Sequence, residues 1–398
     1  MSKFLLVWET GANLGHIGAL LPVAIALRDR GHQVEFALQA SADMEKINAA
    51  HQFPCRPAPQ LPVRPGAKRP LVSYADMMLY LGYDIPASLY VTMQAWRKLY
   101  AEVQPDVAVL NAAPTAMLAA RGMPFKTALY GNSFDLPPMT HPLPAFRSWI
   151  ATPAQELLKK EDALLVSINA VLRRLGLETV KQVSQLFQSD ERLLCAMKEL
   201  DHYPARPPEK YWGWKVATDG GQAFQWKGHT RHRVFAYIRV GEDRLRQIVA
   251  QIRNPDCEYA FFVPGTSAAL CDELSDGNVR IFNQPLKVDD VVKTCSLAIT
   301  HATIGTMTAF LLHGVQLLML PIQLEQFMVG RRIAGQGYGL MCNIDDPALN
   351  MALPIQQMLR DTKFRNKARE FAKKYGKEAE KIVPALVDRL CAVAAQVD

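Results

Sequence analysis

Side chains suited to binding a diphosphate gather in one short stretch of the sequence, residues 300–326. An apolar run ends at Thr300, a turn holds His301 and Gly305, and a helical pattern begins at Thr306. The first turn of a helix has unpaired backbone N–H groups and the positive end of the helix dipole, and both favour an anion. The hydroxyl of Thr306 and the imidazole of His301 add two hydrogen-bonding groups. The stretch therefore predicts a diphosphate site, although an ordinary strand–helix–strand unit with an incidental histidine has the same pattern.

A second pair of polar side chains follows the next strand. The apolar run 317–320 ends at Pro321, and Glu325 and Gln326 come soon after it. Loops at the carboxyl ends of neighbouring parallel strands meet at one edge of a sheet, so we expect Glu325 and Gln326 to emerge beside His301. A carboxylate and an amide suit sugar or ribose hydroxyls, since each hydroxyl both donates and accepts a hydrogen bond.

Another histidine with possible chemistry lies near the amino terminus. A strand of buried type, residues 4–8, leads into a turn that contains His16, and a helical pattern follows. The glycines Gly11, Gly15 and Gly18 are too far apart for a dinucleotide-binding G-x-G-x-x-G turn. A histidine has a near-neutral ordinary pKa and can accept a proton at physiological pH. A loop histidine can equally be a solvated residue or a helix cap.

Both stretches resemble the signatures of one family, the inverting nucleotide-sugar-dependent glycosyltransferases of family one. Its donor-sugar signature is His-x-Gly-x-(Gly/Asn)-(Ser/Thr), then a Gly-Val/Ile-Pro stretch, a strand, and Pro-x-x-x-(Asp/Glu)-Gln. The similar segments here are His301–Thr306, Gly314–Gln316 and Pro321–Gln326. Thr303 replaces the usual glycine and Gln316 the usual proline, which predicts a less open phosphate loop. The turn around His16 resembles the amino-terminal signature of the same enzymes.

The resemblance implies the GT-B fold, an α/β architecture of two doubly wound parallel-sheet domains that face each other across a cleft. It implies that His16 is the catalytic base and that Ile17, Phe134 and Asp135 belong to the acceptor site. The donor-binding residues that it implies are Gly241, Asn283, Gln284, His301, Thr303, Gly305, Thr306, Glu325 and Gln326. Asn283 and Gln284 correspond to the family's nucleobase-binding turn, although Gln284 could equally be a plain loop residue.

The residue expected to orient His16 departs from the family pattern. Most of the resembling enzymes have an aspartate at the end of the strand after Pro105-Asp106, where this sequence has Asn111. The amide oxygen can still accept the imidazole N–H, but a neutral amide leaves the pKa of His16 lower than an aspartate would. We therefore expect a preference for acidic acceptors such as phenols or carboxylic acids. The alternative is that Asn111 only caps the following helix and that Glu9 or Asp135 serves His16.

The composition is that of a soluble protein with two domains of ordinary size. The chain has 398 residues, of which 49% are hydrophobic and 21% charged. Its apolar runs are shorter than the ~18–20 residues of a membrane span, and its amino terminus lacks a secretory segment, so we expect a cytoplasmic protein. The seven scattered cysteines lack a C-x-x-C pair, which predicts reduced thiols and no metal site. The net charge of +7 suits anionic ligands and at most peripheral membrane contact, and it is too small to indicate nucleic-acid binding.

Alternating strand and helix patterns predict two α/β domains. We expect an acceptor-binding domain over residues 1–205, a linker over 206–232, a nucleotide-sugar-binding domain over 233–377 and, from the resemblance, a last helix over 378–398 that crosses back to the first domain.

Three segments of the first domain have patterns of their own. The proline-rich residues 54–70 predict an irregular loop, and residues 150–200 predict helices. Residues 74–100 predict a helical segment interrupted at Pro86. The apolar and aromatic side chains of residues 77–100 fit a lipid-like or aromatic acceptor, and core packing explains them as well.

These observations predict a metal-independent inverting glycosyltransferase. It would move a sugar from a UDP- or dTDP-sugar to a hydroxyl of a small-molecule or lipid acceptor, without a cofactor, because a helix end and an imidazole can stabilise the leaving diphosphate. A nucleotide-sugar epimerase or a phosphorylase on the same fold is the alternative enzyme class. An epimerase would be expected to need several acids, and only Glu9 and Glu325 are found. Thr303 and Asn111 favour a third possibility, a non-catalytic nucleotide-sugar-binding or helper protein.

Overall fold

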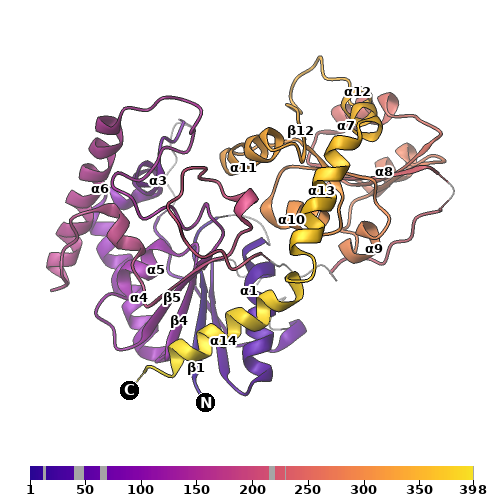
Figure 1. Ribbon diagram of the computed structural model, residues 1–398. Helices are drawn as coiled ribbons and strands as arrows, with labels where there is room; N and C mark the ends of the chain where they lie inside the picture. The colour runs from indigo at the N-terminus through magenta and orange to yellow at the C-terminus, as the bar shows by residue number, and fades with distance from the viewer. Residues whose placement is uncertain (12–14, 40–48, 63–69, 215–219, 229, 398) are drawn as a thin grey trace. The chain divides into compact units, whose positions relative to one another are not determined.

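The computed structural model describes residues 1–11, 15–39, 49–62, 70–214, 220–228 and 230–397, and it divides into two compact units (Figure 1). Unit 1 comprises Met1–Gly213 and Ile382–Asp398, and unit 2 comprises Trp214–Lys381. Each unit contains one six-stranded sheet in which the paired strands run parallel. The predicted fold class of two doubly wound parallel-sheet domains is confirmed.

The sheet of unit 1 reverses its strand order between β1 and β4. Its order is β3-β2-β1-β4-β5-β6. The strands are β1 (Lys3–Trp8), β2 (Gln33–Leu38), β3 (Cys55–Pro57), β4 (Val107–Asn111), β5 (Lys126–Gly131) and β6 (Glu191–Leu194). Trp8 at the end of β1 lies opposite Asn111 at the end of β4. In a doubly wound sheet the loops diverge beyond the carboxyl ends of two such strands, and this switch point is where ligands bind.

The helices of unit 1 include the last helix of the chain. They are α1 (Gly15–Asp29), α3 (Tyr74–Met78), α4 (Pro86–Val103), α5 (Pro114–Ala119), α6 (Ala154–Arg174) and α14 (Ile382–Ala394), with a π-helical turn (Leu79–Tyr83) and 3₁₀ turns (Val183–Phe187, Lys198–Leu200). Pro86 stands in the first turn of α4, where its missing N–H is not needed. Helix α14 packs against α1, β4 and β5 (Figure 1). Its Arg389 donates to the carboxylate of Glu191 in β6.

Unit 2 has the same strand order as unit 1, and its switch point lies between β7 and β10. The sheet order is β12-β11-β10-β7-β8-β9. The strands are β7 (His232–Tyr237), β8 (Cys257–Phe262), β9 (Val279–Phe282), β10 (Leu297–Thr300), β11 (Gln316–Met319) and β12 (Gly339–Met341). The helices are α7 (Glu242–Gln251), α8 (Ala268–Leu274), α9 (Val288–Val292), α10 (Ile304–Leu311), α11 (Leu324–Gly335), α12 (Ala352–Arg360) and α13 (Thr362–Tyr375), followed by a 3₁₀ turn (Ala379–Lys381).

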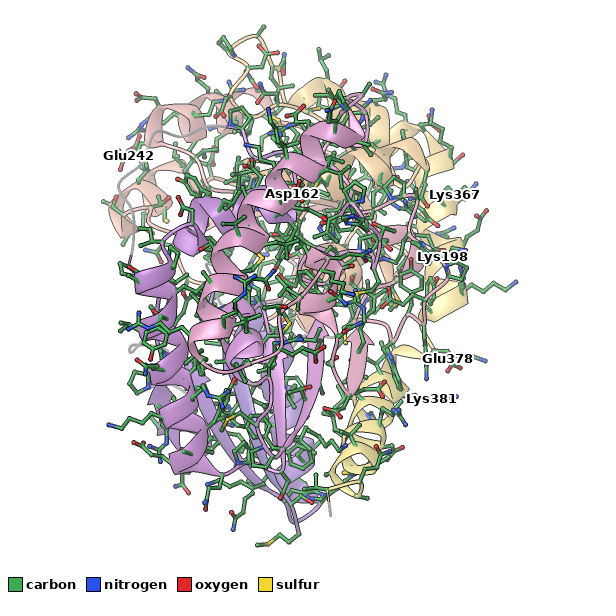
Figure 2. The ribbon with its side chains drawn as sticks, turned by 90° about the vertical axis from the view of Figure 1, so that its left-hand side faces the viewer. Asp162, Lys198, Glu242, Lys367, Glu378 and Lys381 are labelled. Carbon is green, nitrogen blue, oxygen red and sulfur yellow. The ribbon has the colours of Figure 1, made fainter. Side chains whose placement is uncertain are left out.

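Burial explains why these segments form layers. The central strands β1 and β4 are apolar almost without interruption, as is typical of strands covered by helices on both faces. In unit 2 the apolar faces of α7, α12 and α13 join the strands in one hydrophobic cluster. Charged side chains lie on the outer faces of helices, for example Asp162 on α6, Glu242 on α7 and Lys367 on α13 (Figure 2).

Three short strands are absent from the sequence-based expectation. Strand β3 lies in the stretch predicted to be an irregular loop, β6 lies in the stretch predicted to be helical, and β12 falls where no strand is predicted. Both predictions are wrong at these points. All three strands lie at an edge of their sheet and contain three or four residues, which is too short for a periodicity to show.

The predicted linker, residues 206–232, is divided between the two units. Its first part bridges to unit 1, where Tyr211 pairs with Leu194, and a later part bridges to unit 2, where Gln222 pairs with Leu286. The boundary between the units falls after Gly213, within the predicted linker.

Two further findings concern the class of protein. All seven cysteines are free thiols. No helix within the described part of the chain is long and apolar enough to cross a membrane.

Gly339 allows β12 to pair closely with β11, and its replacement tests this packing. A methyl group on Gly339 would overlap the carbonyl oxygen of Leu317, and a buried backbone atom cannot move aside cheaply. We expect Gly339→Ala to destabilise the protein by about 1–3 kcal/mol or more in urea unfolding. Gly335→Ala, at the end of α11, is the control, because nothing lies within 4 Å of its added methyl. Equal stability of the two variants would contradict the pairing.

Candidate functional site

The switch point of unit 1 holds a hydrogen-bonded pair, His16 and Asn111. His16 lies in the first turn of α1, and Asn111 is the last residue of β4. Nδ1 of His16 lies 2.7 Å from Oδ1 of Asn111, while Nδ2 of Asn111 donates to the carbonyl oxygen of Tyr130 at 2.8 Å. The second bond turns the amide oxygen toward His16. Because that oxygen can only accept, Nδ1 of His16 carries the proton and Nε2 is the basic nitrogen of the neutral ring.

Two further residues set the orientation of the His16 ring. The indole of Trp8 stacks on the imidazole, with ring centroids 5.4 Å apart and planes inclined by 19°. Trp8 is itself buried, and its Nε1 donates to the carbonyl oxygen of Thr10 at 2.7 Å. Gly11 has φ +101°, and a methyl group on it would lie 2.7 Å from Nε2 of His16. The basic nitrogen therefore sits beside the one residue type that leaves room for it.

Glu9 caps helix α5. Its Oε2 accepts the backbone N–H groups of Thr115 and Ala116 at 2.8 and 3.0 Å, and the residue in the cap position, Ala113, has no side-chain cap bond. The alternative in which Asn111 caps this helix is therefore wrong. The same alternative expected Glu9 or Asp135 to contact His16. The structure instead places Asn111 against Nδ1 of His16. Burial raises the pKa of Glu9 to about 7, against the opposing effect of the hydrogen bonds from Thr115 and Ala116.

Asp135 has a buried carboxyl oxygen at the carboxyl end of β5. Its Oδ2 has no hydrogen-bond partner among the described residues. Its Cβ would lie 3.0 Å from a methyl group on Gly131, so the side chain folds back over the end of the strand. Burial raises the pKa of Asp135 to about 7, and a hydrogen bond from the backbone of Asn132 opposes this. A carboxyl group that is partly protonated near neutral pH can both donate to and accept from a hydroxyl.

The other two predicted acceptor residues differ from each other. Phe134 is half-buried and stacks on Phe146, with ring centroids 5.2 Å apart. Ile17 is 7% exposed and packs into the core beneath α1. Phe134 and Asp135 thus lie in the loop after β5, whereas Ile17 is a core residue.

In unit 2, His301 bonds to the backbone through both ring nitrogens. Nδ1 donates to the carbonyl oxygen of Leu320, and Nε2 accepts the N–H of Arg239, each at 2.6 Å. The ring is 2% exposed, and burial lowers its pKa, so it is neutral. His301 thereby ties together the loops after β7, β10 and β11. The predicted donation from the imidazole to a diphosphate does not fit this arrangement, because neither ring nitrogen is left for it.

The amino end of α10 keeps the other features of an anion site. Thr303 is the cap residue without a side-chain bond to the backbone, and its hydroxyl donates instead to Oγ1 of Thr306 at 2.9 Å. The Thr306 oxygen accepts this bond, so the hydrogen of its own hydroxyl points away from Thr303. Thr303, Gly305 and Thr306 are half-buried, and the first backbone N–H groups of a helix have no acceptor within it.

Each switch point also contains a strained alanine. Ala112 directly follows Asn111 and has φ +43°, and Ala302 directly follows His301 and has φ +60°. A left-handed conformation costs a non-glycine residue about 1–2 kcal/mol. Strained backbone of this kind is concentrated at functional sites, where the surrounding structure enforces it.

The loops after β10 and β11 meet at one edge of the sheet, as predicted. Thr300 lies opposite Met319, and the N–H of Leu320 donates to the carbonyl oxygen of Thr300 at 2.7 Å. Gln326 does not present its oxygen to a sugar, however, because Oε1 accepts the N–H groups of Ile322 and Gln323 at 2.9 and 3.2 Å. The expected role of Gln326 is therefore corrected to that of a capping residue of α11.

The remaining predicted donor residues occupy strand and helix ends. Glu325 is half-buried in the first turn of α11. Gly241 is the exposed cap residue of α7. Asn283 is half-buried and Gln284 is exposed, both directly after the edge strand β9. Gln316, in place of the usual proline, begins β11 and donates through Nε2 to the carbonyl oxygen of Met358 at 3.0 Å.

Sequence reasoning missed Trp8, Gly11 and Arg239. Arg239 lies just after β7, at the switch point of unit 2, and has an exposed side chain. Trp8 ends a central strand, and Gly11 and Arg239 lie in the loops after central strands, so the rule that ligand-binding residues follow strand ends could have found them. Within the described ranges, no group of three His, Cys, Asp or Glu side chains could hold a metal ion.

No protein-family model matches the sequence, and no curated protein matches it. Solved structures do match. The glycosyltransferase VinC in complex with dTDP is 16% identical, with a TM-score of 0.67 over 99% of this chain and 100% of that one. The calicheamicin glycosyltransferase CalG4 is 16% identical, with a TM-score of 0.74 over 100% and 99%. The spinosyn rhamnosyltransferase SpnG complexed with thymidine diphosphate is 20% identical, with a TM-score of 0.66 over 98% and 100%. The chain has the GT-B fold of these glycosyltransferases.

The buried carboxyl of Glu9 makes the stability of the protein depend on pH. Its folded-state pKa of about 7 lies above the ordinary 4.5. Between these values the folded protein binds more protons at Glu9 than the unfolded chain, so the free energy of unfolding falls as pH rises. Glu9→Gln keeps an oxygen for the N–H groups of Thr115 and Ala116 but cannot ionise.

Thermal unfolding measures this dependence. We expect the free energy of unfolding of Glu9→Gln, relative to that of the parent, to rise by about 2–3 kcal/mol between about pH 5 and 8. Glu242→Gln, an exposed glutamate in the first turn of α7, is the control and should follow the parent. A constant difference between Glu9→Gln and the parent across this pH range would refute the raised pKa.

Proposed function

We propose that the protein is an inverting, metal-independent glycosyltransferase that moves a sugar from a UDP- or dTDP-sugar to a hydroxyl of a small molecule. The observation that carries the proposal is the His16–Asn111 pair at the switch point of unit 1. The GT-B fold supports it, because the similar chains are glycosyltransferases: VinC was solved with dTDP, and SpnG with thymidine diphosphate and with spinosyn aglycone. The free thiols suit a reducing compartment, and we propose a cytoplasmic location.

The acceptor hydroxyl loses its proton to Nε2 of His16 in this proposal. Asn111 holds the imidazole in the tautomer that leaves Nε2 basic, Trp8 stacks on the ring, and Gly11 leaves room for it. Because the amide of Asn111 is neutral, it orients the imidazolium but does not stabilise its charge by Coulomb attraction. The enzyme should therefore work best on hydroxyls that are themselves acidic, such as phenols.

The leaving nucleoside diphosphate is stabilised by groups of unit 2. The backbone N–H groups at the start of α10 and the hydroxyl of Thr306 donate hydrogen bonds, and Arg239 supplies a positive charge close by. His301 acts as a positioning residue, since it holds the loop of Arg239 against the loop before α10. This set of donors does the work that a divalent cation does in other enzymes, and it is the basis for proposing metal independence.

Inversion follows from the use of a single base. An acceptor activated by His16 attacks the anomeric carbon directly, and the nucleoside diphosphate leaves from the opposite face. One displacement inverts the configuration, whereas retention needs two.

The proposal is tested by comparing His16→Ala with Thr306→Val. The purified proteins are given UDP- and dTDP-sugars with a phenol acceptor in EDTA, and product formation and nucleoside diphosphate binding are measured separately. We expect His16→Ala to bind the nucleotide like the parent and to lose roughly 10²–10⁴-fold in transfer. Thr306→Val should bind the nucleotide roughly tenfold more weakly, because it loses a hydrogen bond to a charged group.

Three results would count against the assignment. Inactivity of the parent toward the whole donor panel in EDTA, followed by activity once Mg²⁺ is added, would refute metal independence. Equal loss of binding and transfer in His16→Ala would make the turn structural. Unchanged nucleotide binding in Thr306→Val would move the donor site away from α10.

Asn111→Asp tests the pairing with His16. A carboxylate should raise the pKa of His16 and speed transfer to an alcohol acceptor, with little change for a phenol. The aspartate cannot donate to the carbonyl oxygen of Tyr130 as Nδ2 of Asn111 does, so we also expect a loss of about 1–3 kcal/mol in stability. Rates with both acceptors, histidine NMR titration and thermal unfolding give the three readouts. Unchanged titration of His16 together with unchanged rates would contradict the pairing.

A further inference from the structure

Unit 2 contains a hollow at the amino ends of its strands, the opposite ends from the candidate donor groups. Its volume is about 750 Å³. The residues before β7, β8, β10 and β11 line it together with residues of α12 and α13. The hollow is therefore built from loops and helices that take no part in the proposed transfer reaction.

The charge of this hollow is strongly positive. Five cationic side chains line it: Arg231, Lys293, Arg360, Arg365 and Arg369. The only acidic side chain in the lining is Asp256. Within the described part of the chain, no ion pair involves any of the five cations. Arg231 and Arg365 also lower the pKa of the lining residue His232, after the larger effect of burial and against Asp256, so their charges act within the hollow.

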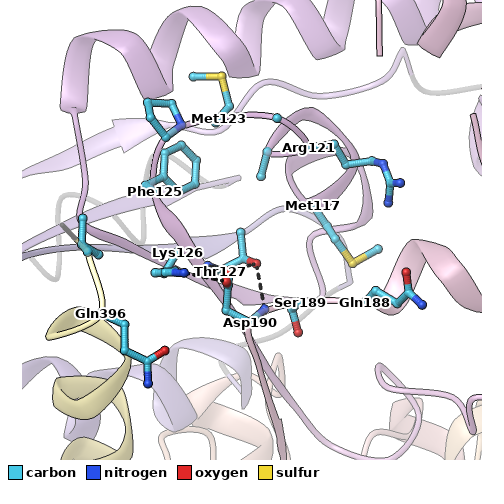
Figure 3. A pocket seen from close by; sticks show the side chains of 14 residues that line it. Met117, Arg121, Met123, Phe125, Lys126, Thr127, Gln188, Ser189, Asp190 and Gln396 are labelled. Atoms are coloured by element: carbon cyan, nitrogen blue, oxygen red, sulfur yellow. Dashed lines mark hydrogen bonds and ion pairs between the residues drawn. The ribbon is translucent and has the colours of Figure 1, made fainter. Parts of the chain in front are cut away.

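A comparable hollow in unit 1 has no such excess of charge (Figure 3). It has a volume of about 700 Å³ and also lies at the amino end of a strand, β5. There Asp190 forms an ion pair with Lys126 at 3.3 Å and accepts from the backbone and hydroxyl of Thr127 at 2.8 and 3.0 Å. The contrast indicates that the unpaired cations of unit 2 are not a general feature of strand ends in this protein.

Three of the five cations lie on helices, Arg360 on α12 and Arg365 and Arg369 on α13. Arg365 and Arg369 are one turn apart on α13, and Nη2 of Arg365 donates to the carbonyl oxygen of Leu359 at the end of α12 at 3.3 Å. The stem of Arg369 lies over Gly314, whose φ is +73° and where a methyl group would come within 3.2 Å of Cγ. Hydroxyl and amide groups complete the lining, from Asn254, Thr294, Ser296, Gln356 and Thr362.

We propose that this hollow binds a small, multiply charged phosphate compound. Four guanidinium groups offer the planar pairs of donors that match phosphate oxygens. Five positive charges against one negative charge call for a ligand with several negative charges, which a single carboxylate does not have. The volume is that of a small-molecule site. The phosphates could belong to a soluble compound or to a polyphosphorylated lipid headgroup, and the polar lining suits the hydroxyls of either.

Binding of inorganic triphosphate to the full chain, measured by calorimetry, tests the proposal. The site variant is Arg360→Gln/Arg369→Gln, because both side chains are exposed and neither makes a hydrogen bond among the described residues. The control is Lys373→Gln/Lys377→Gln, which removes the same charge from exposed positions outside the hollow. We expect the site variant to bind at least roughly tenfold more weakly and the control to bind like the parent.

Two additional arms locate and identify the ligand. Thr306→Val separates this hollow from the proposed donor site, and it should retain triphosphate binding. Phosphatidylcholine vesicles with and without a polyphosphorylated phosphatidylinositol distinguish a lipid headgroup from a soluble ligand, since only a lipid site co-sediments with the phosphorylated vesicles. The proposal is overturned if neither probe binds, if the control weakens binding as much as the site variant, or if only Thr306→Val loses triphosphate.

Discussion

The amide of Asn111 is the interaction on which the candidate site of unit 1 depends. Asn111 is fully buried at the end of β4, and a buried amide must have partners for both of its ends. Its Nδ2 satisfies the carbonyl oxygen of Tyr130 in β5, and its Oδ1 satisfies Nδ1 of His16 in α1. Asn111 therefore connects β4 to both β5 and α1, and it also sets the tautomer of His16. Loss of either partner would leave a buried polar atom unpaired. The position of Nε2 of His16 is therefore coupled to the stability of the carboxyl ends of β4 and β5.

The same arrangement recurs in unit 2 with different chemistry. In each unit a loop after the first strand bonds to a loop after the fourth, across the switch point: Thr10 donates to the carbonyl oxygen of Ala112, and Arg239 donates to His301. A left-handed alanine follows the key polar residue in both. The parallel sheet explains the recurrence, because the loops diverge at this point and need a tie of their own. In unit 1 the tie is made by the backbone and hydroxyl of Thr10, whereas in unit 2 it uses a ring nitrogen of His301, whose other nitrogen bonds to Leu320.

Two buried carboxyl groups of unit 1 differ in what their oxygens contact. Glu9 and Asp135 have pKa values raised to about 7 by burial. Glu9 uses an oxygen on the first turn of α5, so it stabilises the helix that follows β4. Asp135, the residue after Phe134, has a buried oxygen without a partner in the described residues. A partly protonated carboxyl is a suitable contact for an uncharged hydroxylated acceptor, because it can both donate and accept a hydrogen bond.

The sequence by itself determined the fold class, the central strands and the residues that follow them. Apolar runs and turn residues are local features, and long central strands such as β1 have enough of them to be recognised. The edge strands β3, β6 and β12 were not recognisable, because three or four residues carry no period and their pairing partner lies elsewhere in the chain. The tertiary structure alone decided which polar atoms remain available: His301 and Gln326 carry the expected side chains, but the backbone of neighbouring loops occupies them. It also gathered the cations of unit 2 from residues 231 to 369, since only folding brings charges so distant in sequence to one hollow.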